Sequence, residues 1–104
     1  MIPSLREWHQ RYGPRGFVII GNHRPEFSHE GDLGNLEGAI ERLHIDYPVA
    51  QDNDGLTWKA YGVRYWPTLL LIDQHGRVRY KHIGEGRYDE TEAAIQTLLA
   101  EAYP

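Results

Sequence analysis

The chain has 104 residues, a formal net charge of -4 at pH 7 and no cysteine. The length suits a single domain, and the acidic balance with scattered arginines argues against general affinity for nucleic acid or an anionic membrane, since phosphate binding needs basic residues gathered on one face. Without cysteine, disulfides, thiolate zinc sites and cysteine redox chemistry are excluded within these residues. No apolar run is long enough to span a membrane, and the first residues do not resemble a signal or transit peptide.

The first half of the chain alternates between helical and strand patterns. Leu5, Trp8 and Tyr12 recur at helical spacing, and the continuous β-branched run 17–21 is typical of a strand that is buried on both faces. Asp32 is a suitable cap for the helix that follows a polar loop. The predicted elements are a helix over residues 1–12, a strand over 17–21, a loop over 22–31, a helix over 33–43 and a short edge strand over 47–50.

The second half predicts two further strands and a final helix. Asp89 and Glu92 have the spacing of a capping box at the start of an amphipathic helix. The predicted elements are a turn over 52–55, a short helix over 56–61, a buried strand over 68–72, a hairpin turn over 73–76, a strand over 77–83 and a helix from Asp89 onward. This order predicts an α/β domain with helices on both faces of a mixed sheet.

The segment Tyr65-Trp66-Pro67-Thr68 stands directly before the second buried strand and is the most specific local feature. An aromatic residue before proline favours a cis bond, although a proline at a strand entrance is, taken alone, more often trans. The surrounding pattern is Trp-x-x-Tyr-Gly-Val-x-x-x-Pro-Thr over 58–68, then Leu-Leu-Leu-Ile-Asp-x-x-Gly-Arg-Val over 69–78, then Gly84-Glu85-Gly86. With these motifs the chain resembles, over essentially its whole length, thioredoxin-fold redoxins of the TlpA/DipZ type, the thioredoxin-like domains of cytochrome c biogenesis and periplasmic thiol–disulfide exchange.

The resemblance implies a thioredoxin-like fold, a mixed sheet flanked by helices, in which Pro67 is the family's cis-proline. In the family a Cys-x-x-Cys motif at the end of the central strand precedes the first helix, and one thiolate attacks a disulfide while the other resolves it. Here Met1 falls a few residues after the place of the second cysteine. The resemblance therefore implies no catalytic residue in this chain and a redoxin domain over 1–104 that is incomplete at its N-terminus.

The family's central strand would lie between the strands over 17–21 and 68–72. Its loss would leave peptide groups unpaired on both neighbours, at about 1–3 kcal/mol for each buried group. We therefore expect one of three outcomes: a truncated piece, a strand recruited from another copy or a partner, or two strands that close directly on each other.

The resemblance assigns a substrate-facing surface to Trp66, Pro67 and Thr68, where backbone groups would pair with an extended peptide, and it places His23 and Glu85 beside the same cleft. The expected partner is an extended peptide or a thiol protein, and no cofactor is expected. Two alternatives stay open: a redox-inactive binding module that uses this groove, or a structural fragment that self-associates as a homodimer or strand-exchanged oligomer. Relatives of this type work outside the cytoplasm, often tethered to a larger membrane protein.

Two other clusters invite a metal interpretation. His23, Glu26, His29 and Glu30 share one loop, but their spacing matches no established zinc pattern, and we expect no metal. Residues 52–55 resemble a calcium loop but lack its first and last acidic ligands, so we expect a turn and helix cap there.

Overall fold

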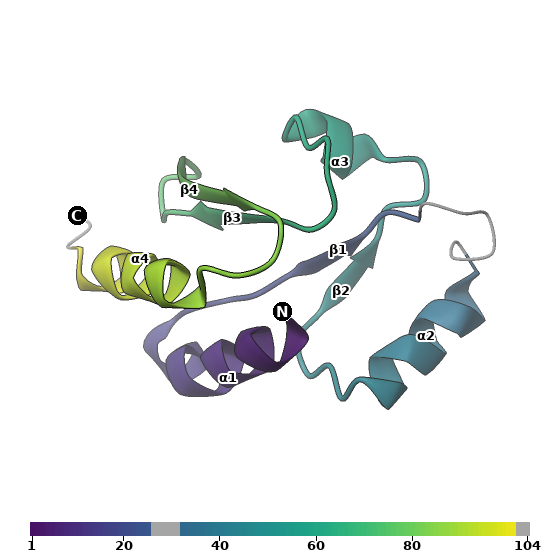
Figure 1. Cartoon of the computed structure of the whole chain (residues 1–104), viewed down its shortest axis with the longest axis horizontal. Coiled ribbons are helices and arrows are strands. Elements are labelled where there is room, and N and C mark those ends of the chain that lie inside the picture. The colour runs from purple at the N-terminus through teal and green to yellow at the C-terminus, as the bar shows by residue number, and fades with distance from the viewer. Residues whose placement is uncertain (26–31, 102–104) are drawn as a thin grey trace.

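The computed structural model describes residues 1–25 and 32–101, which form four α-helices, one 3₁₀ turn and four short strands (Figure 1). In chain order they are α1 (Ile2–Tyr12), η1 (Gly13–Arg15), β1 (Gly21–His23), α2 (Leu33–Arg42), β2 (Val49–Gln51), α3 (Leu56–Ala60), β3 (Thr68–Ile72), β4 (Val78–Ile83) and α4 (Tyr88–Ala100). This is the predicted order of helices and strands. In the described part of the chain, no helix is both long enough and apolar enough to cross a membrane.

The strands form two separate pairs instead of one continuous sheet. β1 and β2 pair in parallel with Gly21 opposite Val49, and β3 and β4 pair antiparallel with Thr68 opposite Ile83. Within the described residues β1 does not pair with β3. The expectation that these two strands close directly on each other is therefore wrong.

The strand predicted over 17–21 is displaced toward the C-terminus. The ladder with β2 begins only at Gly21, whose N–H donates to the carbonyl of Pro48 at 2.8 Å. Residues 17–20 precede this ladder and pair with no strand in the described part of the chain. Their burial alternates, with Val18 71% and Ile20 66% exposed while Phe17 and Ile19 pack against the core. The expectation of burial on both faces is wrong, because no side chain of residues 1–25 or 32–101 buries the face that carries Val18 and Ile20.

The apolar core lies between α1, α4 and the β3–β4 hairpin. Trp8, Tyr12, Leu71 and Ile95 are buried together. The ring of Trp8 meets that of Tyr88 edge-on at 6.3 Å between centroids, which joins the two helices. The helical periodicity of the sequence thus identifies the residues that α1 and α4 bury.

The predicted N-terminal cap is correct for α2 and wrong for α4. The Asp32 carboxylate accepts the N–H of Asn35 at 2.9 Å, so the predicted cap of α2 is confirmed. The capping box predicted at Asp89 is wrong, because α4 begins at Tyr88 and Arg87 occupies the cap position without a side-chain cap. Asp89 lies instead in the first helical turn, where a negative charge interacts favourably with the helix dipole.

Candidate functional site

The site around Trp66 is built on α3, which the turn over 52–55 anchors to β1. The Asp52 carboxylate accepts the N–H groups of Thr57 at 3.2 Å and Trp58 at 2.9 Å, together with the side-chain amide of Asn22 at 3.1 Å. Burial acts to raise the pKa of Asp52, but these hydrogen bonds outweigh it and lower the pKa below its usual value. The predicted turn and helix cap are confirmed, and the carboxylate serves the fold.

Trp66 is held in place by Trp58 and Arg24. The two indole rings lie 4.3 Å apart between centroids, and the guanidinium of Arg24 sits over the Trp58 ring at 5.3 Å. The indole N–H of Trp66 donates to the carbonyl of Arg24 at 3.1 Å. Trp66 nevertheless stays 49% exposed. These contacts fix the ring while leaving one part of it open to a ligand.

The start of β3 is tied to the loop that follows β4. The Trp66–Pro67 peptide bond is cis. The carbonyl of Pro67 accepts the N–H of Gly84 at 2.8 Å, and the hydroxyl of Thr68 donates to the carbonyl of Tyr65 at 2.7 Å. Glu85, exposed, directly follows Gly84. Trp66, Pro67, Thr68 and Glu85 therefore lie together, as the resemblance implies.

The backbone of Trp66 is available to a partner. In residues 1–25 and 32–101 neither its N–H nor its C=O takes part in a backbone hydrogen bond. A free peptide donor and acceptor beside a half-exposed indole can hold an extended peptide by main-chain hydrogen bonds and aromatic contact.

His23 lines a different cavity, of about 660 Å³, between α2 and the β1–β2 pair. Most of its lining is apolar, and α2 contributes Leu36 and Ile40, with Leu43 directly after the helix. The structure thus brings four of the five predicted site residues together around Pro67 and places His23 beside α2.

The metal interpretation rests mostly on residues that the structure does not describe. Glu26, His29 and Glu30 lie outside the described residues. Across residues 1–25 and 32–101, no group of three or more His, Asp or Glu side chains converges on a point where it could hold a metal ion.

Sequence reasoning did not identify Arg24 and Trp58 as parts of this site. The hydrogen bond from Trp66 to Arg24 spans 42 residues of sequence, and no local pattern reports such a contact. The sequence held one usable signal, since a tryptophan inside a short helix, here Trp58, can stack on a tryptophan in the loop that follows, here Trp66.

Comparison with known proteins places these features in a family. The Redoxin family model matches residues 1–99. The chain is 43% identical to Protein DipZ of Mycobacterium tuberculosis over 99% of its own length and 15% of DipZ. It is 28% identical to the thiol-disulfide oxidoreductase ResA of Bacillus thuringiensis over 93% of its length and 53% of ResA. The crystal structure of a thioredoxin-like superfamily protein matches with a TM-score of 0.85 and 32% identity, covering 99% of this chain and 71% of that one. The thioredoxin-like fold is confirmed, and the chain spans only part of each of these relatives.

Proposed function

We propose a docking function for this chain, which belongs to the Redoxin family. The proposal is that it docks an extended peptide at Trp66, Pro67 and Thr68 for thiol–disulfide exchange. The observation that carries the proposal is the unpaired backbone of Trp66 beside its half-exposed indole. Strand addition would supply main-chain hydrogen bonds, and the indole would pack against a peptide side chain. Because Trp58, Arg24 and Gly84 already hold this segment, little ordering entropy would be lost on binding.

The chain has no cysteine, so the reacting thiols would come from outside these 104 residues. The relationship to ResA, a thiol-disulfide oxidoreductase, supports the reaction class. Within that class, the TlpA/DipZ resemblance favours a role of the kind that redoxins play in cytochrome c biogenesis. The contribution of this chain would be substrate docking, with the sulfur chemistry done by the molecule that supplies the thiols.

The test is a titration of the chain with a neutral probe, an acetylated and C-terminally amidated peptide of alternating valine and threonine with one central glutamine. We expect the indole N–H resonance of Trp66 and the amide resonance of Gly84 to shift on binding. Trp66→Ala should weaken binding by about tenfold or more, as loss of a central aromatic anchor does. Tyr61→Ala, a change at another exposed aromatic (46%), should leave it unaltered. Equal affinities for the unmodified chain and Trp66→Ala would contradict peptide docking at this site.

A second candidate function, self-association through open strand edges, is favoured by a separate observation. Residues 18–20 make no backbone hydrogen bond in the described part of the chain, and β3 pairs on only one edge. Val18 and Ile20 are strongly exposed beside this free backbone. An exposed apolar segment with unpaired peptide groups is a template for pairing with another chain, here a second copy.

Sedimentation equilibrium combined with amide hydrogen exchange tests this candidate. If copies pair through this edge, protection of the amides of 18–20 should rise with protein concentration, and Val18→Lys combined with Ile20→Lys should give a monomer. Leu33→Lys, at a 55% exposed leucine on α2, should leave the association unchanged. A monomer at all concentrations, with unprotected amides over 18–20, would rule the candidate out.

A further inference from the structure

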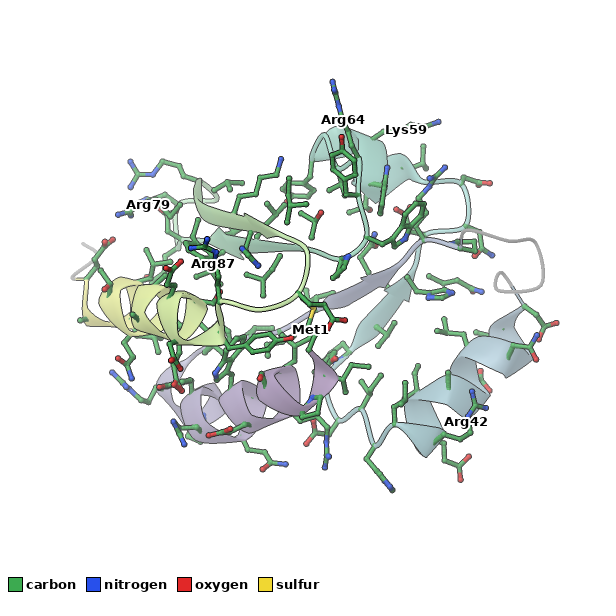
Figure 2. The ribbon with its side chains drawn as sticks, viewed as in Figure 1. Met1, Arg42, Lys59, Arg64, Arg79 and Arg87 are labelled. Carbon is green, nitrogen blue, oxygen red and sulfur yellow. The ribbon has the colours of Figure 1, made fainter. Side chains whose placement is uncertain are left out.

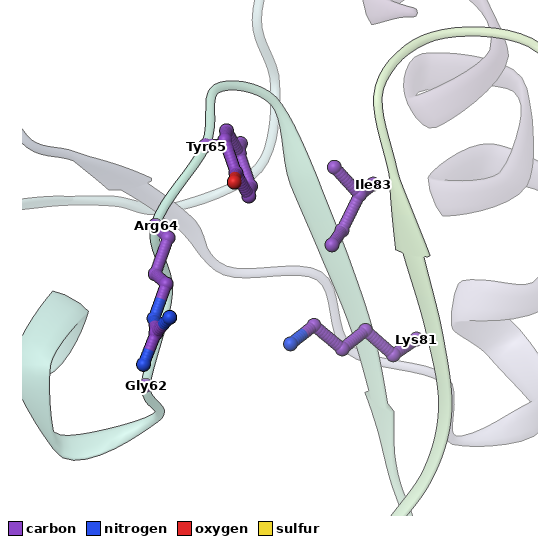
Figure 3. Close-up of a pocket in the computed structure, with 5 residues that line it drawn as sticks. All are labelled: Gly62, Arg64, Tyr65, Lys81 and Ile83. Atoms are coloured by element: carbon purple, nitrogen blue, oxygen red, sulfur yellow. The ribbon is translucent and has the colours of Figure 1, made fainter.

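A small cavity with two cationic side chains adjoins the proposed peptide-docking segment. It has a volume of about 350 Å³ and is lined by Gly62, Arg64, Tyr65, Lys81 and Ile83 (Figure 3). Arg64 comes from the loop after α3 and Lys81 from β4, and Figure 3 shows the Lys81 ammonium pointing across the opening toward the guanidinium of Arg64. Two positive groups from separate elements therefore share one opening.

The charges of Arg64 and Lys81 are not neutralised within the described residues. No carboxylate of residues 1–25 or 32–101 lies within ion-pair distance of either group, whereas four of the eight other arginines form ion pairs: Arg11, Arg77, Arg79 and Arg87. Two like charges that face the same space repel each other. An anion placed between them would replace this repulsion by two attractions, and a guanidinium can bind a carboxylate through two parallel hydrogen bonds.

The cavity lies where a side chain of the docked peptide would reach it. Tyr65 directly precedes Trp66, and Ile83 is the register partner of Thr68 at the start of the β3–β4 ladder. Side chains of an added strand alternate between its two faces, so every second side chain is directed to the same side. The volume is near the lower limit of small-molecule sites and suits one side chain better than a whole cofactor.

We propose that the Arg64–Lys81 cavity binds the carboxylate of an aspartate or glutamate in the docked peptide, so that acidic extended peptides are preferred. The apolar surfaces of Tyr65 and Ile83 would pack against the methylene groups of that side chain, while the two cations hold its carboxylate. The inference rests on the proposed function, which places the peptide at Trp66, Pro67 and Thr68.

The experiment compares the neutral probe peptide with a twin that carries glutamate in place of its central glutamine, by calorimetry at low ionic strength. The glutamate peptide should bind about tenfold more tightly, as charge-assisted hydrogen bonds allow. In the double variant Arg64→Gln, Lys81→Gln the preference should disappear while affinity for the glutamine peptide is kept. Arg15→Gln combined with Arg42→Gln removes the same charge elsewhere, and Figure 2 shows Arg42 on α2, away from Arg64; this control should keep the preference.

A second measurement separates failure of the cavity from failure of peptide docking. Titration with N-acetylglutamate α-methylamide, whose one carboxylate is on the side chain, should shift the amide resonances of Gly62 and Tyr65 in the unmodified chain and not in the double variant. The α-methylamide of N-acetylglutamine, which has no carboxylate, should shift them in neither. Equal affinity for the two peptides together with unmoved resonances would overturn the acidic preference and leave the proposed function standing. Resonances that move with N-acetylglutamate α-methylamide, when neither peptide binds, would support the carboxylate site and overturn peptide docking.

Discussion

The half of the molecule built from α1, α4 and the β3–β4 hairpin has a closed apolar core, whereas the half built from α2 and the β1–β2 pair is open. In the first half Trp8 and Tyr12 are each 3% exposed and Ile95 is 1% exposed. In the second, Leu36 at 8% and Tyr47 at 7% are buried beside a cavity of about 660 Å³. The proposed docking segment joins the two halves, because Thr68 begins β3 of the closed half while Trp66 donates to the carbonyl of Arg24, which directly follows β1.

The strongest test of this comparison removes a side chain from the closed core. Ile95→Ala should lower the free energy of unfolding by about 2–5 kcal/mol, because a cavity remains where the surrounding side chains cannot collapse. Leu36→Ala, the matched change in the open half, should cost less than about 2 kcal/mol, since Leu36 already borders empty space. Urea unfolding of both variants measures the difference. Equal losses would show that the two halves are packed alike.

The hairpin of the closed half should give the fold a specific sensitivity to acid. Burial acts to raise the pKa of Asp73, but hydrogen bonds from the backbone of Arg77 and His75 and from the side chains of Arg79 and Arg77 lower it to about 2. Since an unfolded aspartate titrates near pH 3.9, the folded state binds fewer protons in this range. The stabilisation is therefore complete above about pH 4 and is lost as the pH falls toward about 2.

Asp73→Asn should lower stability at neutral pH by less than Ile95→Ala does, and it should flatten the dependence of stability on pH between about 4 and 2. Thermal unfolding at a series of pH values measures both effects. Asp54→Asn, at an exposed aspartate in the turn before α3, serves as the control and should keep the acid dependence of the unmodified chain. If Asp73→Asn lost stability at low pH as the unmodified chain does, other carboxylates would be the cause of the acid sensitivity.

A third, smaller effect on stability is expected from a substitution beside Arg24, the residue that links the two halves. Gly55 has a φ of +70°, and a Cβ added there would collide with the guanidinium of Arg24. Gly55→Ala should cost about 1–2 kcal/mol of backbone strain and should also displace Arg24 from the Trp58 ring, which near-ultraviolet circular dichroism detects. Gly62, at φ +65°, has nothing within 4 Å of its added Cβ, so Gly62→Ala isolates the strain alone. Identical spectra for the two variants would contradict a role of Arg24 in positioning the indoles.

Local signals in the sequence were sufficient for the helices and for the β3–β4 hairpin, whose strands were predicted over 68–72 and 77–83, but not for the strand over 17–21. The helical spacing of Trp8 and Tyr12 and the cap at Asp32 depend on residues a few positions apart, and the structure keeps them. The strand over 17–21 was misplaced because a strand exists only where a neighbour pairs with it, and β2 pairs only from Gly21 onward. The site around Pro67 came from a resemblance, whereas the contact between Arg24 and Trp66 depends on the finished fold.

The open half should accept added volume that the closed half rejects. Ala39 lines the cavity beside α2, so Ala39→Leu should fill part of it and raise the free energy of unfolding by about 0.5–1 kcal/mol. Ala94→Leu, at a position packed against the closed core, should instead destabilise the chain because the extra methylenes find no space. Urea unfolding of the two variants measures whether each substitution raises or lowers the free energy of unfolding. If Ala39→Leu destabilised the chain as well, the cavity would be too constrained to hold a leucine, and α2 would be packed more rigidly than its exposed residues indicate.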